Sequence, residues 1–107
     1  MSQAVVHNQT IYIAGQVATD SRAAGAADQT KEILAKIDAL LAAADPDKSK
    51  ILSATIWLTD MSTFAEMNRI WDAWVTPGST PARATVTSPQ LAAPDYKVEI
   101  AVIAAQS

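Results

Sequence analysis

The chain contains no cysteine and only one histidine, and these two shortages exclude several kinds of chemistry. Without cysteine there can be no disulfide, no thiol nucleophile and no thiolate metal site. The single histidine, His7, cannot assemble a metal cluster or share a proton with a second histidine, so we interpret it as a structural or surface residue. The sequence therefore predicts no metal site and no cofactor held by such groups.

Long apolar runs and clustered positive charge are missing as well. No apolar run approaches the roughly 20 residues that a membrane span needs, and the first residues lack the pattern of a signal peptide. Eight Lys and Arg against eleven Asp and Glu give a formal net charge of -3, and the basic residues are scattered. Because nucleic-acid-binding proteins present a cationic surface, we expect neither a nucleic acid nor a membrane as partner. The expected location is the cytoplasm.

The residues that are present describe one small folded domain. Half of the 107 residues are hydrophobic and 18% are charged, which favours a packed chain over a disordered one. At this length folding buries roughly two thirds of the unfolded chain's surface, enough for one core. We therefore interpret residues 1–107 as a single domain without repeats or linkers.

Hydrophobic periodicity predicts alternating strands and helices. Alternation with a period of two indicates strands at residues 10–15, 50–60, 83–86 and 97–105, with an additional strand at 4–6. Helical spacing indicates helices from about residue 28 to 44 and from 63 to about 75. Asp45-Pro46 should end the first helix, and a Thr63–Glu66 capping box should begin the second. The expected inward faces are Leu52, Ala54, Ile56 and Leu58 on the strand, and Phe64, Met67, Trp71 and Trp74 on the second helix.

The order of these elements is β, α, β, α, β, β. Two helices can cover only one face of such a sheet. The other face is too apolar to remain in water, and a patch of this kind marks a partner surface. We therefore expect a homo-oligomer that covers Tyr12, Thr55, Trp57, Ala101 and Ile103.

Two charged residues within strands are the best candidates for chemistry. Arg83 follows Pro81, whose fixed φ stiffens the entry to the strand, and alternation places Arg83 and Thr85 on one face. Glu99 stands between two apolar residues in the most hydrophobic strand, where a carboxylate needs a partner or a function. In one interpretation both are surface charges that could pair across the sheet. In the other, Arg83 binds the carboxylate of a small substrate and Glu99 handles water or a proton.

Other conspicuous residues have simpler explanations. Trp71 and Trp74 fall on the apolar stripe of their helix, so core packing accounts for them better than stacking on bases. Asp60 and Asp72 have no metal-ligand spacing around them and are interpreted as a strand-end turn and a solvated helix position. Gly15 is a lone glycine at a strand end and implies no phosphate loop.

Several blocks of the sequence occur together in one known family. The blocks "SQAVV", "IYIAGQV", "ILSATIWLTDMSTFAEMN", "TPARATV" and "YKVEIAVIAA" have the order and spacing of the RidA family, also called the YjgF family. The resemblance covers essentially the whole chain. It implies a chorismate-mutase-like α+β fold with a mixed sheet, and a homotrimer whose sheets form a central barrel with the helices outside.

The resemblance also implies an activity and a site. Characterised members hydrolyse reactive enamines and imines, such as 2-aminoacrylate, to 2-keto acids and ammonia without metal or cofactor, in clefts lined by two subunits. The family's substrate-carboxylate arginine falls on Arg83, its water-handling glutamate on Glu99 and its helix asparagine on Asn68. The remaining substrate-binding positions that it implies are Thr85, Ala14 and Gly15.

The chain departs from the family pattern at several of these positions. Met1 stands where many active members have tyrosine, Ala14 where serine is frequent, and Thr85 where cysteine is frequent. These departures motivate an alternative function, a trimer that binds small carboxylates without turnover. We rank the ribonuclease and translation-inhibitor functions named for some relatives last, because the chain is acidic, has no cluster of basic residues for RNA and has no histidine pair.

Overall fold

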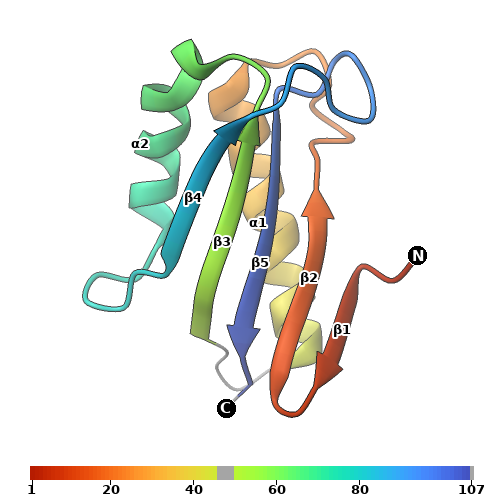
Figure 1. The fold of residues 1–107 in the computed structure, drawn as a ribbon, viewed down its shortest axis with the longest axis vertical. Coiled ribbons are helices and arrows are strands. Elements are labelled where there is room, and N and C mark those ends of the chain that lie inside the picture. Colours follow the sequence, from red (N-terminus) through yellow and green to blue (C-terminus); the bar gives the residue numbers. More distant parts are fainter. Residues whose placement is uncertain (46–49, 107) are drawn as a thin grey trace.

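The computed structural model describes residues 1–45 and 50–106, and the strands of this part form one mixed five-stranded sheet. The order across the sheet is β1-β2-β5-β3-β4 (Figure 1). Neighbouring strands are antiparallel except β3 and β4, which are parallel. The elements along the chain are β1 (Ala4–His7), β2 (Thr10–Gln16), α1 (Ala26–Ala44), β3 (Lys50–Leu58), the short 3-10 helix η1 (Met61–Thr63), α2 (Phe64–Trp74), β4 (Ala82–Thr87) and β5 (Val98–Ala105).

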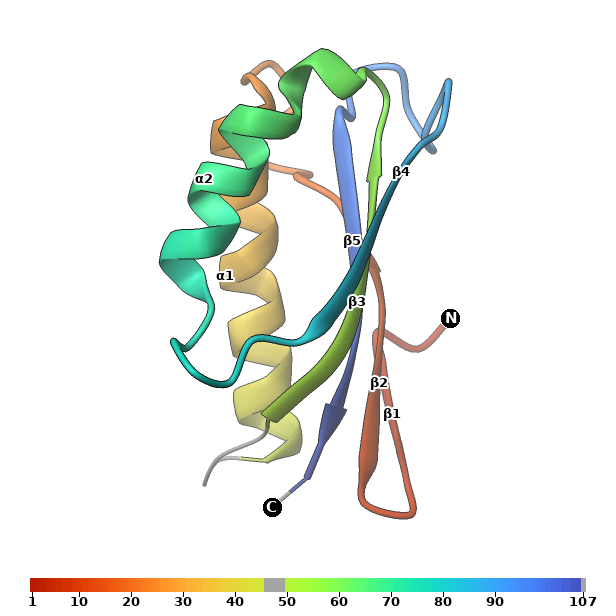
Figure 2. The same cartoon turned by 60° about the vertical axis from the view of Figure 1, so that its left-hand side comes forward.

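Both helices pack on the same face of the sheet, as the sequence predicts (Figure 2). The core lies between the helices and the inward side chains of the strands. Burying each large aliphatic side chain there contributes about 1.5–3 kcal/mol. The largest fully buried apolar side chains are Ile11, Ile33, Ile37, Ile56, Leu58, Met67, Val98, Ile100 and Val102.

The predicted elements are confirmed with small shifts of their ends. The expected first strand exists as β1, and α1 starts two residues before the expected Asp28. It ends at Ala44, where the Asp45 amide donates to Leu41 O at 2.8 Å. Pro46, which we expected to end this helix, lies outside the described residues. None of the helices in the described ranges has the length and apolar character that crossing a bilayer requires.

Two local predictions are wrong. Leu52 is 51% exposed rather than inward, because the pairing of β3 with β5 shifts by one residue between Ile51 and Ser53. The predicted capping box is absent, since the Thr63 side chain makes no cap to α2 and its hydroxyl donates to Asp60 O at 2.7 Å. The chain enters α2 through η1, whose cap is the Asp60 carboxylate accepting from the Ser62 amide at 2.9 Å.

The outer face of the sheet, the face without helices, is apolar. The strand registers place Tyr12 opposite Ile103, Ala101 opposite Thr55, and Trp57 opposite Val86. Trp57, Thr55 and Ala101 are half-buried by their neighbours. The exposed large side chains of this face are Val5 (50%), Tyr12 (45%), Val86 (42%) and Ile103 (38%). A patch of this kind, on the face that we expected to be apolar, is typical of a surface between subunits.

Candidate functional site

Arg83 lies on the helix-facing side of β4 and is held by α2. Its register partner on β3 is the buried Ala54. The guanidinium Nη1 donates to Asn68 Oδ1 at 2.6 Å, and its Cζ lies 5.5 Å from the ring centroid of Trp71 and 5.6 Å from that of Phe64. Cation–π contacts and a hydrogen bond therefore fix the position of a side chain that could otherwise take many rotamers.

The three residues that hold Arg83 form what we call the α2 clamp: Phe64, Asn68 and Trp71. Their spacing of four and three residues puts them on one face of the helix. Asn68 Nδ2 donates to Asp72 Oδ2 at 3.3 Å, one turn further on, so the amide oxygen is directed at Arg83. Within the described residues Arg83 forms no ion pair with a carboxylate. A guanidinium has five N–H donors, so the α2 clamp leaves Arg83 with donors that can bind a carboxylate through two hydrogen bonds.

Thr85 shares the helix-facing side with Arg83, two residues further along β4. Its hydroxyl oxygen is buried and has no hydrogen-bond partner among the described residues. Since buried hydroxyls are almost always satisfied, this group is available to a bound molecule. The sequence-predicted residues Arg83, Asn68 and Thr85 are thus brought together.

Glu99 lies on the opposite face of the sheet from Arg83. Its register partner is Trp57, three residues along β3 from the partner of Arg83, and the side chains of a strand alternate between faces. β3 also separates the two strands that carry these residues. The interpretation in which Arg83 and Glu99 pair across the sheet is therefore wrong. A single copy of the chain presents them as two half-sites.

Gly15, which the resemblance assigns to substrate binding together with Ala14, lies against the Glu99 side chain. The pairing of β2 with β5 passes from Ile13 to Gln16 while β5 moves only from Val102 to Ile100, so β2 has a bulge containing these two residues. Bulges bend a strand and re-aim its residues, and they occur often beside functional sites. Here the bulge brings Gly15 under the Glu99 side chain, whose Cδ would lie 2.9 Å from a Cβ at position 15.

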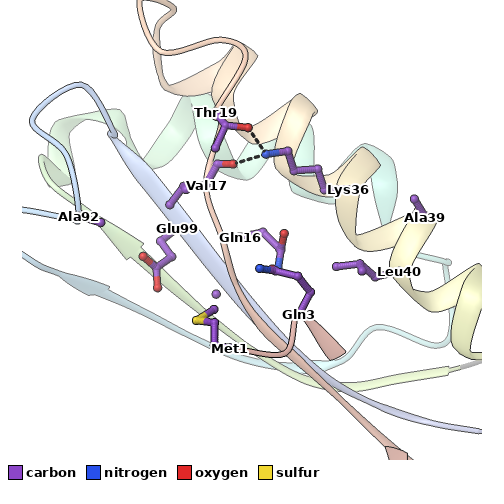
Figure 3. A pocket seen from close by; sticks show the side chains of 11 residues that line it. Met1, Gln3, Gln16, Val17, Thr19, Lys36, Ala39, Leu40, Ala92 and Glu99 are labelled. Atoms are coloured by element: carbon purple, nitrogen blue, oxygen red, sulfur yellow. Dashed lines mark hydrogen bonds between the residues drawn. The ribbon is translucent and has the colours of Figure 1, made fainter. Parts of the chain in front are cut away.

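The Glu99 carboxylate projects into a pocket of about 650 Å³ (Figure 3). This volume suits a small organic ligand. Gln16 Nε2 donates to Gln3 Oε1 at 2.8 Å, which anchors the segment before β1 beside the bulge. Met1 also lines the pocket and lies next to Glu99. The other residues of the pocket wall are Val17, Thr19, Lys36, Ala39, Leu40 and Ala92.

The surroundings of Glu99 shift its pKa upward. Burial disfavours the charged carboxylate and raises the pKa of Glu99 above its ordinary value. Lys36 does not counter this effect by binding Glu99, because its Nζ donates to Val17 O at 2.8 Å and Thr19 Oγ1 at 2.6 Å and pairs with Glu32 at 3.2 Å. A carboxyl group with a raised pKa can exchange protons with a substrate nearer neutral pH.

Sequence reasoning missed the residues that place these groups. Phe64 and Trp71 were assigned to the core, and the spacing of the α2 clamp on one helix face is the signal that could have joined them to Asn68. Asp72 is bonded to Asn68 rather than only solvated. Asp60 caps a strand-end turn and His7 is exposed, as expected. In residues 1–45 and 50–106, no three His, Asp or Glu side chains could hold a metal ion together.

Comparisons with known proteins agree over nearly the whole chain. A sequence model described as endoribonuclease L-PSP matches residues 1–106. The RutC family protein YoaB of Escherichia coli is 47% identical and covers 97% of this chain and 89% of its own length. A mouse protein named 2-iminobutanoate/2-iminopropanoate deaminase is 36% identical over 98% of this chain and 80% of its own length. The crystal structure of a YjgF family protein from Neisseria meningitidis superposes with a TM-score of 0.92 at 45% identity, covering 100% of this chain and 87% of that one.

Proposed function

Because the chain belongs to the RidA/YjgF family, we propose that it hydrolyses reactive enamines and imines of the 2-aminoacrylate and 2-imino acid type to 2-keto acids and ammonia. The deaminase names of the mouse and rat relatives support this activity. The observation that carries the proposal is Arg83, which the α2 clamp fixes while most of its donors stay unused.

The proposed reaction needs positioning and proton transfer. Arg83 binds the substrate carboxylate through its planar fork. An enamine first becomes the imine by gaining a proton on its β-carbon and losing one from nitrogen. Water then adds to the imine carbon, the carbon–nitrogen double bond becomes single, and the resulting carbinolamine loses ammonia as its hydroxyl becomes the keto oxygen. Glu99 takes a proton from the attacking water and returns one to the leaving nitrogen. The chain's own groups thus suffice, because an imine carbon is already electrophilic and holding it beside the water lowers the barrier.

The proposal requires a site built by two copies of the chain. Arg83 and Glu99 lie on opposite faces of one sheet, so a substrate that meets both must bridge two copies. The exposed apolar patch of the outer face supports association. We propose the family's arrangement, a homotrimer in which the outer faces form the barrel interior and three clefts each combine Arg83 of one copy with Glu99 of the next.

A second candidate is a trimer that binds small 2-keto or other carboxylates without turnover. It is favoured by Met1, Ala14 and Thr85 at the positions where active relatives have tyrosine, serine and cysteine. In this case Arg83 still binds the carboxylate, but Glu99 has no substrate proton to transfer.

A coupled assay tests the proposed function. An amino-acid oxidase or dehydratase supplies a 2-imino acid, and semicarbazide traps the imine that remains. Wild type should lower semicarbazone formation. Arg83→Ala should keep its oligomeric state but hydrolyse the imine at least about 100-fold more slowly. Arg69→Ala, which removes an exposed arginine of α2, is the matched control. Saturable keto-acid binding without any fall in semicarbazone would reject hydrolysis in favour of the second candidate.

A further inference from the structure

We infer that Gly15 is a positioning residue for Glu99: the missing side chain at position 15 leaves the space in which the Glu99 carboxylate lies. The inference rests on the proposed function only in giving Glu99 a catalytic task. Gly15 determines the position of the Glu99 carboxylate, and this position can be measured without an activity assay.

The space is defined by contacts to a single side chain. A Cβ at position 15 would overlap Glu99 Oε2, lie 2.9 Å from its Cδ and lie 3.1 Å from its Cγ. These are the three nearest atoms, and all belong to Glu99. Contacts this close are not tolerated between packed atoms, so any side chain at position 15 must displace Glu99.

Backbone conformation does not explain the glycine. In the described part of the chain Gly78 has a positive φ of 81°, whereas the φ of Gly15 is not positive. An L-residue could therefore adopt the backbone of position 15 without strain. Gly15 is needed because the bulge in β2 brings its backbone under the Glu99 side chain.

The consequence of adding a methyl group follows from which atoms can move. The overlapping atoms are at the end of a flexible side chain and not in the backbone, so the carboxylate should swing away while the sheet stays intact. Away from the bulge it gains water, and the pKa of Glu99 should fall toward its ordinary value. The other charged groups lining this pocket are Lys36, which already has three partners, and the amino group of Met1.

The first test measures the carboxylate directly. NMR titration of the Glu99 side-chain carboxyl carbon is compared in wild type, Gly15→Ala and Gly25→Ala. Gly25 is the matched control, because a Cβ there meets nothing within 4 Å and its φ is -75°. We expect the Glu99 pKa to fall in Gly15→Ala and to stay unchanged in Gly25→Ala. An unchanged pKa in Gly15→Ala would overturn the inference.

The second test asks whether Gly15 acts through Glu99. Gly15→Ala should lower kcat by about 10- to 100-fold with a smaller change in KM, since small misplacements of a catalytic group are costly. In a Glu99→Gln background the same change should cost nothing further, and Glu99→Asp, one methylene shorter, should restore part of the activity of Gly15→Ala. Multiplying losses would mean that Gly15 serves the substrate directly and would contradict the inference.

Two further outcomes are covered by these variants. If Gly15→Ala does not fold, Gly15→Ala with Glu99→Ala should fold again, because truncating Glu99 empties the space; a double variant that stays unfolded counts against the inference. If wild type hydrolyses no imine, the proposed function fails, but the titration still decides where the carboxylate is held.

Discussion

Arg83 and Glu99 acquire their chemical character from opposite kinds of surroundings. Arg83 is a permanent charge that two aromatic rings and one amide hold in place. Glu99 has neither a hydrogen-bond donor nor an ion-pair partner among the described residues, and burial raises its pKa. One group is therefore suited to binding an anion and the other to exchanging protons.

The raised pKa of Glu99 has a cost in stability that can be measured. Such a carboxyl group has a higher pKa in the folded state than in the unfolded chain. Its contribution to folding stability is complete below the unfolded-state pKa, about 4, and is lost as the pH rises through the folded-state pKa. Glu99→Gln stays neutral and escapes this loss. The variant should therefore melt at a higher temperature than wild type at pH 8, with a difference that disappears near pH 4, while losing activity by about 100-fold or more.

Melting curves of both proteins between pH 4 and pH 8, at one protein concentration, check this prediction. Asp20→Asn, which replaces an exposed carboxylate between β2 and α1, is the control. A Glu99→Gln variant that is less stable than wild type at pH 8 would show that the ionised carboxylate has a partner and would contradict the account.

At this scale the sequence singled out Arg83 and Glu99 as candidates but did not show how they lie relative to each other. A lone arginine after Pro81 and a lone carboxylate between apolar neighbours are visible in the alternation of each strand. The alternation cannot show that β3 lies between β4 and β5, so the suggested pairing of Arg83 with Glu99 was wrong. The contact of Gly15 with Glu99 was equally hidden, since it depends on one extra residue in β2.

Among the elements, α2 has two functions. Its apolar stripe buries Met67 and Trp71 against the sheet, and the same face supplies the α2 clamp. Periodicity predicted this helix and its inward face because burial of such a stripe stabilises a helix more than intrinsic propensity does. Its first turn was predicted wrongly, because η1 satisfies Thr63 locally and a capping box is not needed.

The contacts of the α2 clamp predict effects of different size for substitutions at Asn68 and Asp72. Asn68→Ala removes the hydrogen bond to Arg83 and should raise KM for 2-imino acids about tenfold or more, because a hydrogen bond to a charged group is worth about 1.5–3 kcal/mol. Asp72→Ala should have the same direction but a smaller effect, since Asp72 only orients the Asn68 amide.

Steady-state kinetics of the two variants, with Arg69→Ala as control, check this order. Asp72→Asn keeps an acceptor for the Asn68 amide and should recover most of the loss. If Asp72→Ala is more harmful than Asn68→Ala, Asp72 acts on the substrate by another route and the assignment of the clamp is wrong.

On the scale of the whole molecule, the two faces of the sheet differ in what covers them. The helices cover one face, while the other leaves Tyr12 and Ile103 exposed side by side on the neighbouring strands β2 and β5. This division was predictable, because two helices cannot cover both faces and the alternation gave each strand a second apolar side. The number of copies that we propose to cover this face was not predictable from the residues alone and rests on the family resemblance.

A charge on the outer face should separate the copies. Ile103→Glu places a carboxylate within the apolar patch and should convert the proposed trimer to monomers that keep their secondary structure but lose imine hydrolysis. Val6→Glu is the matched control, because Val6 is 46% exposed but pairs with the buried Ile11 and so faces away from the patch. Analytical ultracentrifugation and circular dichroism decide the result, and monomeric wild type or a trimeric Ile103→Glu would refute the proposed interface.

The central claim is that Arg83 and Glu99 of different copies act on one substrate, and subunit complementation tests it most directly. Arg83→Ala and Glu99→Gln, each expected to lose activity by about 100-fold or more alone, are co-expressed with different tags and the mixed oligomers are purified. Each mixed cyclic trimer contains one cleft, about a third of its clefts, that combines the intact arginine of one copy with the intact glutamate of the next. The account predicts recovery of about a third of wild-type activity in the purified mixed trimers. Mixed trimers no more active than the separate variants would show that the two residues do not meet across the interface, and would contradict the account.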